Sequence, residues 1–314
     1  MRNVLRIGTR RSPLAVWQAE HVKSLIERQH AELSCTLVRI VTQGDKIQDS
    51  PLAGIGGKGL FVQEIESALG RGEIDLAVHS MKDLPGIVPA GLRLAAVPPR
   101  EDFRDALVCR EPAGSLDTLP QGACVGTGSL RRTAQLRSYR KDLRIEPVRG
   151  NVETRLRKLD EGRFDAIVLA AAGLKRLGLS SRISELLEPG VCLPAIGQGV
   201  LAIEIREDDA ELARWLDPLN HPPSAAAAAA ERAFLAGMEG SCEVPVAGLA
   251  ELRGPNLTLT GLIASLDGST CIRRSAAGAP QEAATLGSRL AAEVRSAGGE
   301  AILAAILGQE RNPP

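Results

Sequence analysis

The sequence is poor in aromatic residues, which make up 2% of its 314 positions. Proteins that bind single-stranded nucleic acids stack bases on aromatic side chains, and a formal net charge of zero supplies no general attraction for phosphates. No apolar run approaches the roughly 20 residues that a membrane-spanning helix needs. The composition therefore argues against nucleic-acid and membrane partners. Its 44% of apolar residues suffices for two or three ordinary domains.

Histidine and cysteine are too few and too scattered to form a recognisable metal or redox motif. The four histidines share no metal-ligand spacing with the six cysteines, and no C-x-x-C pair occurs, so we expect no metal site. The sequence also begins without a signal-peptide pattern. These features predict reduced thiols and a cytoplasmic location.

Positive charge is concentrated in one segment, residues 129–158, where ten lysines and arginines lie against three acids. Guanidinium groups bind carboxylates through two parallel hydrogen bonds, which suits the recognition of small anions. Clustered arginine without aromatic residues therefore predicts a small anionic substrate.

Strand and helix patterns alternate along the first two thirds of the chain, in two units of the same design. Residues 4–8 form an apolar strand, and Ser12 with Pro13 opens a periodic helix that follows it. Residues 124–129 repeat this arrangement, and residues 162–168 echo residues 72–78. This alternation predicts an α/β fold whose ligands lie beyond the carboxyl ends of parallel strands.

The last third of the chain has a different pattern. Residues 194–199 are interpreted as a hinge that returns the chain to the first unit through a strand at 200–205, and residues 220–223 as a linker. An alanine-rich helix, strands and a closing helix then predict a small α+β domain. The expected ranges are 225–236 for the first helix, 246–252, 257–263 and 270–274 for the strands, and 281–297 for the closing helix.

Two loops of the first unit carry candidate chemistry. The glycine-rich segment 54–59 fits G-x-G-x-x-G but follows no strand, so it is either a lid that contributes Lys58 or a plain surface loop. Asp83 follows a buried strand, where it is either a functional carboxylate or a turn cap. His79 is predicted to be structural, with its ring tied into the strand end.

Cys242 lies on a predicted glycine turn after the alanine-rich helix and is the candidate covalent centre. Its alternative is a half-buried small hydrophobic residue, as free cysteines usually are. Two other functions compete at this point: a non-enzymatic receptor for anions, and a cysteine hydrolase, which would need a histidine partner.

Seven ordered motifs resemble porphobilinogen deaminase, also called hydroxymethylbilane synthase, over nearly the whole chain. They are GTRRSPLA at 8–15, GGKGLF at 56–61, HSMKDLP at 79–85, GTGSLRR at 126–132, RGNVETR at 149–155, LPAIGQG at 193–199 and EGSC at 239–242.

The resemblance implies a fold of two domains like the halves of periplasmic binding proteins, with mixed, mainly parallel sheets and helices on both faces, and a small α+β domain. The expected ranges are 1–99 with 200–217, 100–199, and 218–314. It also implies a cytoplasmic, monomeric transferase of heme biosynthesis that extends a primer by four porphobilinogen units with loss of ammonia, and then releases hydroxymethylbilane by hydrolysis.

The resemblance also implies a role for particular residues. Cys242 would carry a dipyrromethane cofactor through a thioether, and Asp83 would be the catalytic carboxylate. The implied cofactor-binding residues are Lys82, Asp83, Thr127, Ser129, Arg131, Arg132, Arg149 and Gly150. The implied substrate-binding residues are Arg10, Arg11, Ser12, Gln18, Lys58, Arg149, Arg155 and Arg176.

Overall fold

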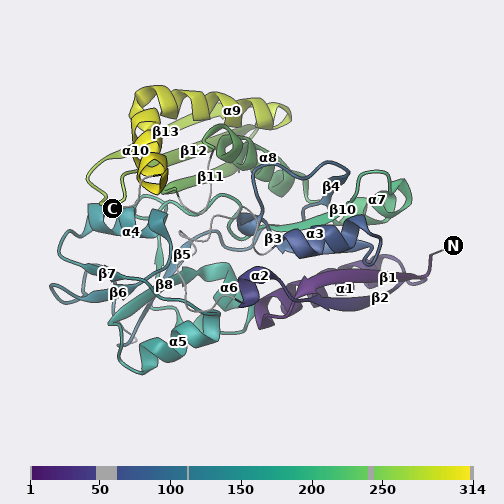
Figure 1. The fold of residues 1–314 in the computed structure, drawn as a ribbon, viewed down its shortest axis with the longest axis horizontal. Coiled ribbons are helices and arrows are strands. Elements are labelled where there is room, and N and C mark those ends of the chain that lie inside the picture. Colours follow the sequence, from purple (N-terminus) through teal and green to yellow (C-terminus); the bar gives the residue numbers. More distant parts are fainter. Residues whose placement is uncertain (1, 47–61, 112, 240–243, 312–314) are drawn as a thin grey trace. The chain divides into compact units, whose positions relative to one another are not determined.

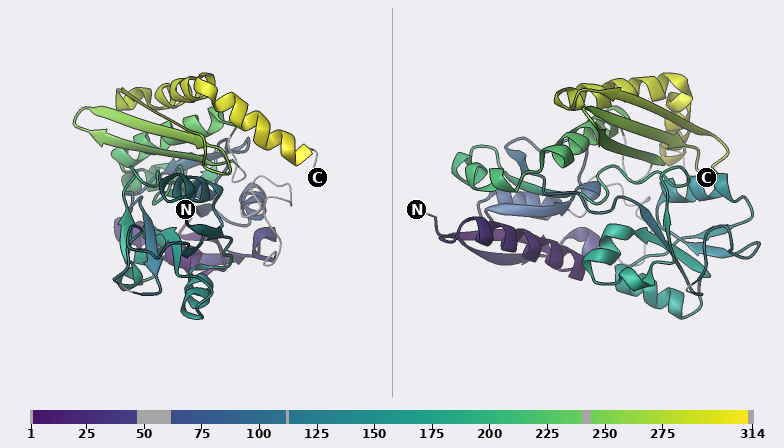
Figure 2. Two further views of the ribbon diagram at one scale, coloured as in Figure 1. Left: turned by 90° about the vertical axis from the view of Figure 1, so that its left-hand side faces the viewer. Right: turned by 180° about the vertical axis from the view of Figure 1, so that it is seen from behind.

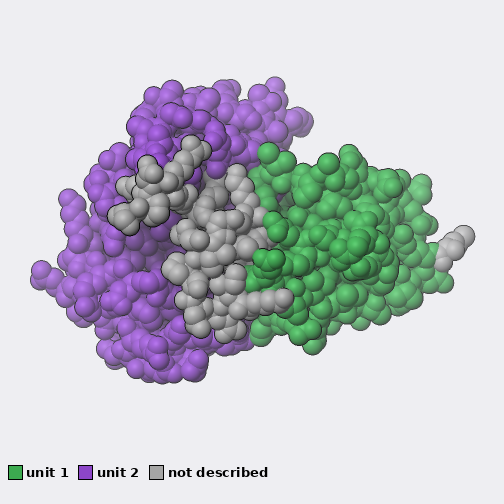
Figure 3. All heavy atoms as spheres, viewed as in Figure 1, with its two compact units in different colours: residues 1–101, 199–225 green, residues 102–198, 226–314 purple. Residues whose placement is uncertain are grey.

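The computed structural model describes residues 2–46, 62–111, 113–239 and 244–311. Lys58 and Cys242 lie outside these ranges. The chain divides into two compact units, which Figure 3 colours separately. Unit 1 comprises residues 1–101 and 199–225, and unit 2 comprises residues 102–198 and 226–314. The expected finer division into three domains stays a prediction.

Unit 1 is built on a mixed five-stranded sheet with the order β2-β1-β3-β10-β4 (Figure 1). β1 pairs in parallel with β2 and β3, whereas β10 is antiparallel to β3 and β4. The predicted return strand is thus β10. The strands are β1 (Val4–Arg10), β2 (Ser34–Ile40), β3 (Leu76–Ser80), β4 (Leu92–Ala96) and β10 (Leu201–Arg206).

Helices cover both faces of this sheet because successive strand residues point to opposite sides. Leu76 and Val78 pack with α1 and α7 in one apolar cluster, whereas Ala77 packs with α3 in another. The helices of unit 1 are α1 (Pro13–Gln29), α2 (Gln43–Lys46), α3 (Gln63–Gly70) and α7 (Ala210–Leu216), with short 3₁₀ turns η2 (Met81–Asp83) and η4 (Asp217–Leu219).

The first sheet of unit 2 repeats this topology, with the order β7-β6-β8-β5-β9 and β5 as its antiparallel strand. α4 packs on one face, and α5 and α6 on the other. The prediction of two α/β units of the same design is confirmed. The elements are β5 (Asp105–Cys109), β6 (Cys124–Gly126), β7 (Arg144–Glu146), β8 (Ala166–Ala170), β9 (Glu185–Leu187), α4 (Leu130–Tyr139), α5 (Val152–Asp160), α6 (Ala171–Arg176) and η3 (Ser180–Arg182).

Unit 2 also contains an antiparallel sheet of three strands, along which α9 runs (Figure 2). Phe234 of α8 is fully buried in its core, and Gly261 makes room for the ring, because a Cβ there would collide with it. The elements are α8 (Pro222–Gly237), β11 (Val246–Arg253), β12 (Asn256–Ala264), β13 (Cys271–Gly278), η5 (Pro280–Glu282), α9 (Ala283–Val294), η6 (Arg295–Gly299) and α10 (Glu300–Arg311).

Three local predictions were wrong. Residues 220–223 are not a plain linker, since α8 already begins at Pro222; proline is tolerated in the first turn of a helix, where its missing N–H costs nothing. The sequence also predicts a polar, glycine-rich loop over residues 42–59, but its beginning forms the short helix α2. The closing helix is followed by a further helix, α10, beyond a kink at Gly298, whose φ is 110°.

Candidate functional site

Four of the predicted residues in unit 1 line one cavity. Arg10 is the last residue of β1, Ser12 precedes α1, Gln18 lies on α1, and Asp83 lies on the turn after β3. The parallel strands β1 and β3 end at the same edge of the sheet, so the loops that follow them lie side by side. This is the place where ligands bind in open α/β sheets.

The local geometry of this cavity is set by α1. Ser12 caps the helix by accepting a hydrogen bond from the Ala15 N–H at 3.3 Å, with Pro13 in the first turn as predicted. The buried amide of Gln18 donates to the Ser80 hydroxyl at 2.8 Å and so ties α1 to the end of β3. Arg11, by contrast, is exposed and does not line the cavity.

Asp83 is exposed at the end of the 3₁₀ turn η2, which Met81 anchors in the core. The turn is closed by the backbone bond from the Leu84 N–H to the Met81 carbonyl. Within the described ranges the Asp83 carboxylate accepts no hydrogen bond, so it does not cap this turn. Lys82 lies beside it and is half-buried. The structure therefore leaves the carboxylate of Asp83 at the cavity without a structural task.

In unit 2 the corresponding edge of the sheet carries the start of α4. Thr127 follows β6, and its hydroxyl accepts a hydrogen bond from the Ser129 N–H at 3.2 Å. Ser129 is the N-cap residue of α4 as predicted, but its hydroxyl does not cap the helix. The hydroxyl of Ser129 is thus not committed to the helix, and the first turn of α4 presents backbone N–H groups that favour an anion.

Arg131 and Arg132, in the first turn of α4, converge on the fully buried carboxylate of Asp105. Arg131 binds it through two hydrogen bonds of 2.6 and 3.1 Å, and Arg132 through two of 2.7 and 3.0 Å. Arg132 also donates to the Val168 carbonyl at 2.9 Å. Burial alone would raise the pKa of Asp105, but the charges of Arg131 and Arg132 outweigh it and hold the pKa well below its usual range.

This buried cluster holds the positive charges of Arg131 and Arg132 against the single negative charge of Asp105. Gln198 donates to Asp105 at 2.9 Å and accepts from Arg131 at 3.2 Å, and among the described residues Asp105 is the only carboxylate paired with the two guanidinium groups. The thiol of Cys192 donates a hydrogen bond to the Asp105 carboxylate at 3.2 Å. Burial raises the pKa of this thiol and the charge of Asp105 raises it further, so the thiol stays neutral. Nε of Arg131 is buried without a hydrogen-bond partner in the described part of the chain. The cluster therefore places two buried guanidinium groups around one carboxylate and leaves one buried N–H without a partner among the described residues.

The loop after β7 lies next to Thr127 and Ser129, because β6 and β7 are paired strands. Gly150 has a φ of 111°, a conformation that favours glycine, and its carbonyl accepts a hydrogen bond from Nε of Arg155 at 2.8 Å. The Arg149 side chain is half-buried beside it. Arg176, at the end of α6 after β8, is buried. The predicted anion-binding residues of unit 2 thus follow β6, β7 and β8.

Sequence reasoning missed the buried acids of both units. Asp105 was not identified, although two adjacent buried arginines require a counterion and Asp105 opens an otherwise apolar strand. Glu204, whose carboxylate bonds to the His79 ring at 3.0 Å, was also missed. The available signal was similar: a single acid in a buried apolar strand, at the start of β5 for Asp105 and inside β10 for Glu204. His79 itself is buried and joined to β10, as its predicted structural role requires.

Two family models match consecutive parts of the chain. Residues 5–214 match the family described as "Porphobilinogen deaminase, dipyromethane cofactor binding domain", and residues 225–296 match "Porphobilinogen deaminase, C-terminal domain". The chain belongs to the porphobilinogen deaminase family. The porphobilinogen deaminase of Roseiflexus castenholzii is 54% identical over 304 residues, covering 97% of this chain and 100% of that protein.

Another porphobilinogen deaminase is similar to this chain over nearly its full length. That of Syntrophotalea carbinolica is 53% identical over 305 residues, covering 97% of this chain and 96% of its own. Among solved structures, the methionine-binding protein MetQ is similar over 69% of this chain and 89% of that chain, with a TM-score of 0.45 and 17% identity. No helix within the described ranges is long and apolar enough to cross a membrane.

The cofactor of porphobilinogen deaminases is a dipyrromethane, and the residues of unit 2 fit such a group. Each pyrrole carries two carboxylates, so the cofactor is a compact polyanion. The surplus positive charge on Arg131 and Arg132, the helix start at Ser129 and the adjacent Arg149 supply donors of the required sign. The donor set therefore suits a polycarboxylate.

Proposed function

We propose that this chain is a hydroxymethylbilane synthase that condenses four porphobilinogen molecules with loss of ammonia and then releases the linear tetrapyrrole by hydrolysis. The observation that carries the proposal is the buried cluster in which two arginines share one carboxylate, Asp105. Such a surplus of buried positive charge is costly unless an anion completes it. A growing polypyrrole, with two carboxylates on every ring, is an anion of this kind.

In this proposal unit 2 holds the carboxylates of cofactor and product. Thr127, Ser129 and Gly150 offer short polar contacts, and the guanidinium groups of Arg149 and Arg155 offer paired hydrogen bonds. Lys82 is a further proposed contact for the carboxylates of the cofactor. Arg131 and Arg132 act mainly through their charge, because most of their donors are already bonded to Asp105 and to backbone carbonyls. The dipyrromethane, carried on Cys242, supplies the pyrrole carbon from which the chain is extended.

Unit 1 performs the chemistry on the incoming substrate. The proposed contacts for the carboxylates of porphobilinogen are Arg10, Arg11, Ser12, Gln18, Lys58 and Arg176. When ammonia leaves, the substrate becomes a cationic azafulvene. The Asp83 carboxylate, uncommitted within the described residues, stabilises that cation electrostatically in a site poor in water.

We further propose that the enzyme is a cytoplasmic monomer with porphobilinogen as its only small-molecule partner. Sedimentation of the purified protein at micromolar concentration tests this: a single species near 33.2 kDa is expected, and a dimer contradicts the proposal.

The intact mass of the purified protein tests the proposed function. The mass should exceed that of the polypeptide by one two-pyrrole adduct, and Cys242→Ser should lose both adduct and activity, because a hydroxyl is a far weaker nucleophile than a thiol. Cys271→Ser is the matched control, since Cys271 is exposed and its loss should leave the adduct in place. An unmodified wild-type mass, or an adduct retained on the serine variant, defeats the proposal.

A further inference from the structure

The loop of residues 147–151, called here the Arg149 loop, runs beside the start of α4 in unit 2. Val148 is buried, and its carbonyl oxygen would lie 3.1 Å from a Cβ at Gly128, which is closer than an ordinary contact. Gly128 directly precedes Ser129, the N-cap residue of α4. The backbone of this loop therefore decides where the Arg149 side chain starts relative to the anion-binding end of α4.

Helix α5 fastens the far end of the Arg149 loop. The Asn151 side chain accepts a hydrogen bond from the Thr154 N–H at 2.8 Å and so caps the helix. Gly150, with its φ of 111°, lies directly on the first turn, where a Cβ would collide with the Thr154 side chain. The loop and the helix start thus fit closely together.

Two long side chains of α5 bind the carbonyl groups of the Arg149 loop. Arg155 and Lys158 are three positions apart, so they are neighbours on the helix surface, and helical side chains lean toward the N-terminus. Nε of Arg155 donates to the Gly150 carbonyl at 2.8 Å, and Nζ of Lys158 donates to the Arg149 carbonyl at 3.1 Å. Two successive carbonyls are therefore each held by a cation, which forms a stronger hydrogen bond than a neutral donor does.

The bond to the Arg149 carbonyl is the one polar contact of the Lys158 side chain within the described residues. Lys158 is half-buried and forms no ion pair there. Its neighbour Arg157, by contrast, is exposed and pairs with Glu161 at 3.1 Å. The ammonium group of Lys158 is thus directed to the loop and not to an acid on the surface of the helix.

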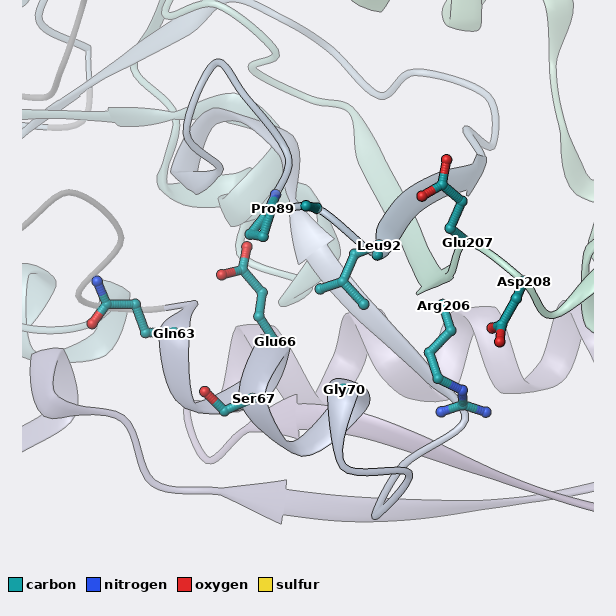
Figure 4. Close-up of a pocket in the computed structure, with 11 residues that line it drawn as sticks. Gln63, Glu66, Ser67, Gly70, Pro89, Leu92, Arg206, Glu207 and Asp208 are labelled. Atoms are coloured by element: carbon teal, nitrogen blue, oxygen red, sulfur yellow. The ribbon is translucent and has the colours of Figure 1, made fainter.

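The guanidinium group of Arg149 itself has no hydrogen bond to any described residue, although the residue is half-buried. Arg206 shows the opposite case. It lines a wide groove of unit 1 together with Glu66 (Figure 4), and its guanidinium donates to the Leu69 and Ile74 carbonyls, each at 3.0 Å. Arg206 is therefore committed to the fold, whereas only the backbone of its loop fixes the place of Arg149.

We propose that Lys158 is a positioning residue that holds the Arg149 loop in its binding conformation. This inference rests on the proposed function, in which Arg149 binds carboxylates of cofactor and substrate. A guanidinium that is already in place binds a carboxylate without first losing backbone freedom, so less binding free energy is spent on ordering the loop. Lys158 supplies this order from behind the loop.

The substitution Lys158→Met tests the role, because methionine keeps the length of the apolar stem but cannot donate a hydrogen bond. On fully loaded protein, kcat/KM for porphobilinogen should fall by roughly tenfold, the lower end for a lost charged hydrogen bond. Lys158→Arg, which can donate to the same carbonyl, should keep most of the wild-type value. Lys141→Met is the matched control: it removes the same charge from an exposed lysine of unit 2 and should leave kcat/KM unchanged.

A double-mutant cycle with Arg149→Leu separates positioning from other roles of Lys158. If Lys158 acts through Arg149, adding Lys158→Met to Arg149→Leu should cause no further loss of kcat/KM. A lysine that only stabilises the fold, or that binds a carboxylate by itself, would cause its full loss in either background, because independent effects add in free energy.

Amide hydrogen exchange of the resting protein gives a measurement that does not depend on activity. The N–H groups of Thr154 and Arg155 are both bonded to Asn151 of the loop, so they report its fastening. Mass spectrometry of peptides covering residues 147–156 should show faster exchange in Lys158→Met. Lys158→Arg and Lys141→Met should exchange like the wild type.

The proposal requires both changes in Lys158→Met, the faster exchange and the lower kcat/KM. Either change without the other overturns it. An equal fall of kcat/KM in Lys141→Met or in Lys158→Arg, or a full additional loss in the double variant, overturns it as well. Should Lys158→Met not fold, Lys158→Gln takes its place with the same expected outcomes, because its shorter side chain does not reach the Arg149 carbonyl.

Failure of the positioning role can be distinguished from failure of the proposed function. If the wild type carries the two-pyrrole adduct and turns over while Lys158→Met behaves like it, only the role of Lys158 is wrong. If the wild type carries no adduct, the proposed function itself is wrong.

Discussion

The five-stranded sheets of the two units share one strand order, yet they bury charge of opposite sign. In unit 1 the polar cluster against β10 contains two carboxyls, Glu66 and Glu204, and one histidine. In unit 2 the cluster against β5 contains two guanidinium groups and one carboxylate, Asp105. The same strand order therefore carries a cluster dominated by acids in unit 1 and a cluster dominated by arginines in unit 2.

The pKa values of Glu66 in unit 1 and Asp105 in unit 2 shift in opposite directions. Burial raises the pKa of Glu66 and the nearby Glu204 adds to the effect, whereas the arginines around Asp105 overcome burial and lower its pKa. Strand order thus fixes where a ligand binds, and the residues at the strand ends fix its chemistry. The following predictions test this contrast, from the largest expected effect to the smallest.

Removing the shared counterion of unit 2 should have the largest effect. Asp105→Asn leaves two buried arginines without a negative partner, and breaking a buried ion pair in this way costs about 3–5 kcal/mol of unfolding free energy. Denaturant unfolding of wild type and variant measures the loss. Asp160→Ala is the control, since its pair with Arg182 is exposed and contributes at most about 1 kcal/mol. Equal losses of unfolding free energy in the two variants would show that the Asp105 cluster stabilises the fold no more than an exposed ion pair does.

Asp83→Asn should break the chemistry of unit 1 and leave binding in unit 2 intact. The variant removes the charge that stabilises the azafulvene, so turnover should fall by about a hundredfold or more. Adduct content and thermal stability should change little, because the Asp83 side chain is exposed and bonds to no described residue. Steady-state rates on fully loaded protein decide the matter, and near-normal turnover would remove Asp83 from the mechanism.

The fold was largely predictable because its signals are local. The apolar run 4–8 predicted β1, the echo of residues 72–78 in residues 162–168 predicted a repeated unit, and Ser12 with Pro13 identified the start of α1. The wrong predictions of local structure lie where one type of residue occurs in two different structural settings. Pro222 suggested a linker but lies in the first turn of α8, and the helix predicted over 281–297 was expected to close the chain but is followed by α10 beyond a kink.

The candidate site was predictable in its arginines and not in its acids. The clustering of basic residues in the sequence identifies Arg131 and Arg132 as candidates. Their counterion, Asp105, is 26 positions away from Arg131, and only the tertiary structure brings it to them. Glu204 and His79 are 125 positions apart and meet through the antiparallel pairing of β10 with β3. The family resemblance supplied residue roles but no hint of these buried partners.

An arginine of unit 2 should affect binding more than chemistry. Arg155→Leu or Arg149→Leu removes a charged hydrogen bond to a carboxylate, which costs about 1.5–3 kcal/mol, or roughly ten- to a hundredfold in affinity. Cofactor loading or elongation should therefore weaken while the fold survives, since neither side chain is buried in the core. Arg157→Leu, on the same helix but in an exposed pair with Glu161, is the control. Unchanged loading and elongation in the test variants would identify them as surface charges.

The pH dependence of stability should separate the two buried acids by sign. Asp105 has a lowered pKa, so its contribution is present above the unfolded value of about 3.9 and is lost as pH falls through the folded value. Glu66 has a raised pKa, so its contribution is present below the unfolded value of about 4.3 and is lost as pH rises through the folded value.

The smallest effect on stability is expected for Glu66→Gln, and this variant should be more stable than the wild type. Glutamine resembles the protonated carboxyl at every pH, so the variant escapes the cost of ionising Glu66 next to Glu204. Its unfolding free energy should match that of the wild type near the unfolded pKa and exceed it increasingly toward neutral pH. Denaturant unfolding of both proteins across this pH range measures the difference. A difference that does not change with pH would show that Glu66 titrates normally, and the contrast between the two sheets would then rest on unit 2 alone.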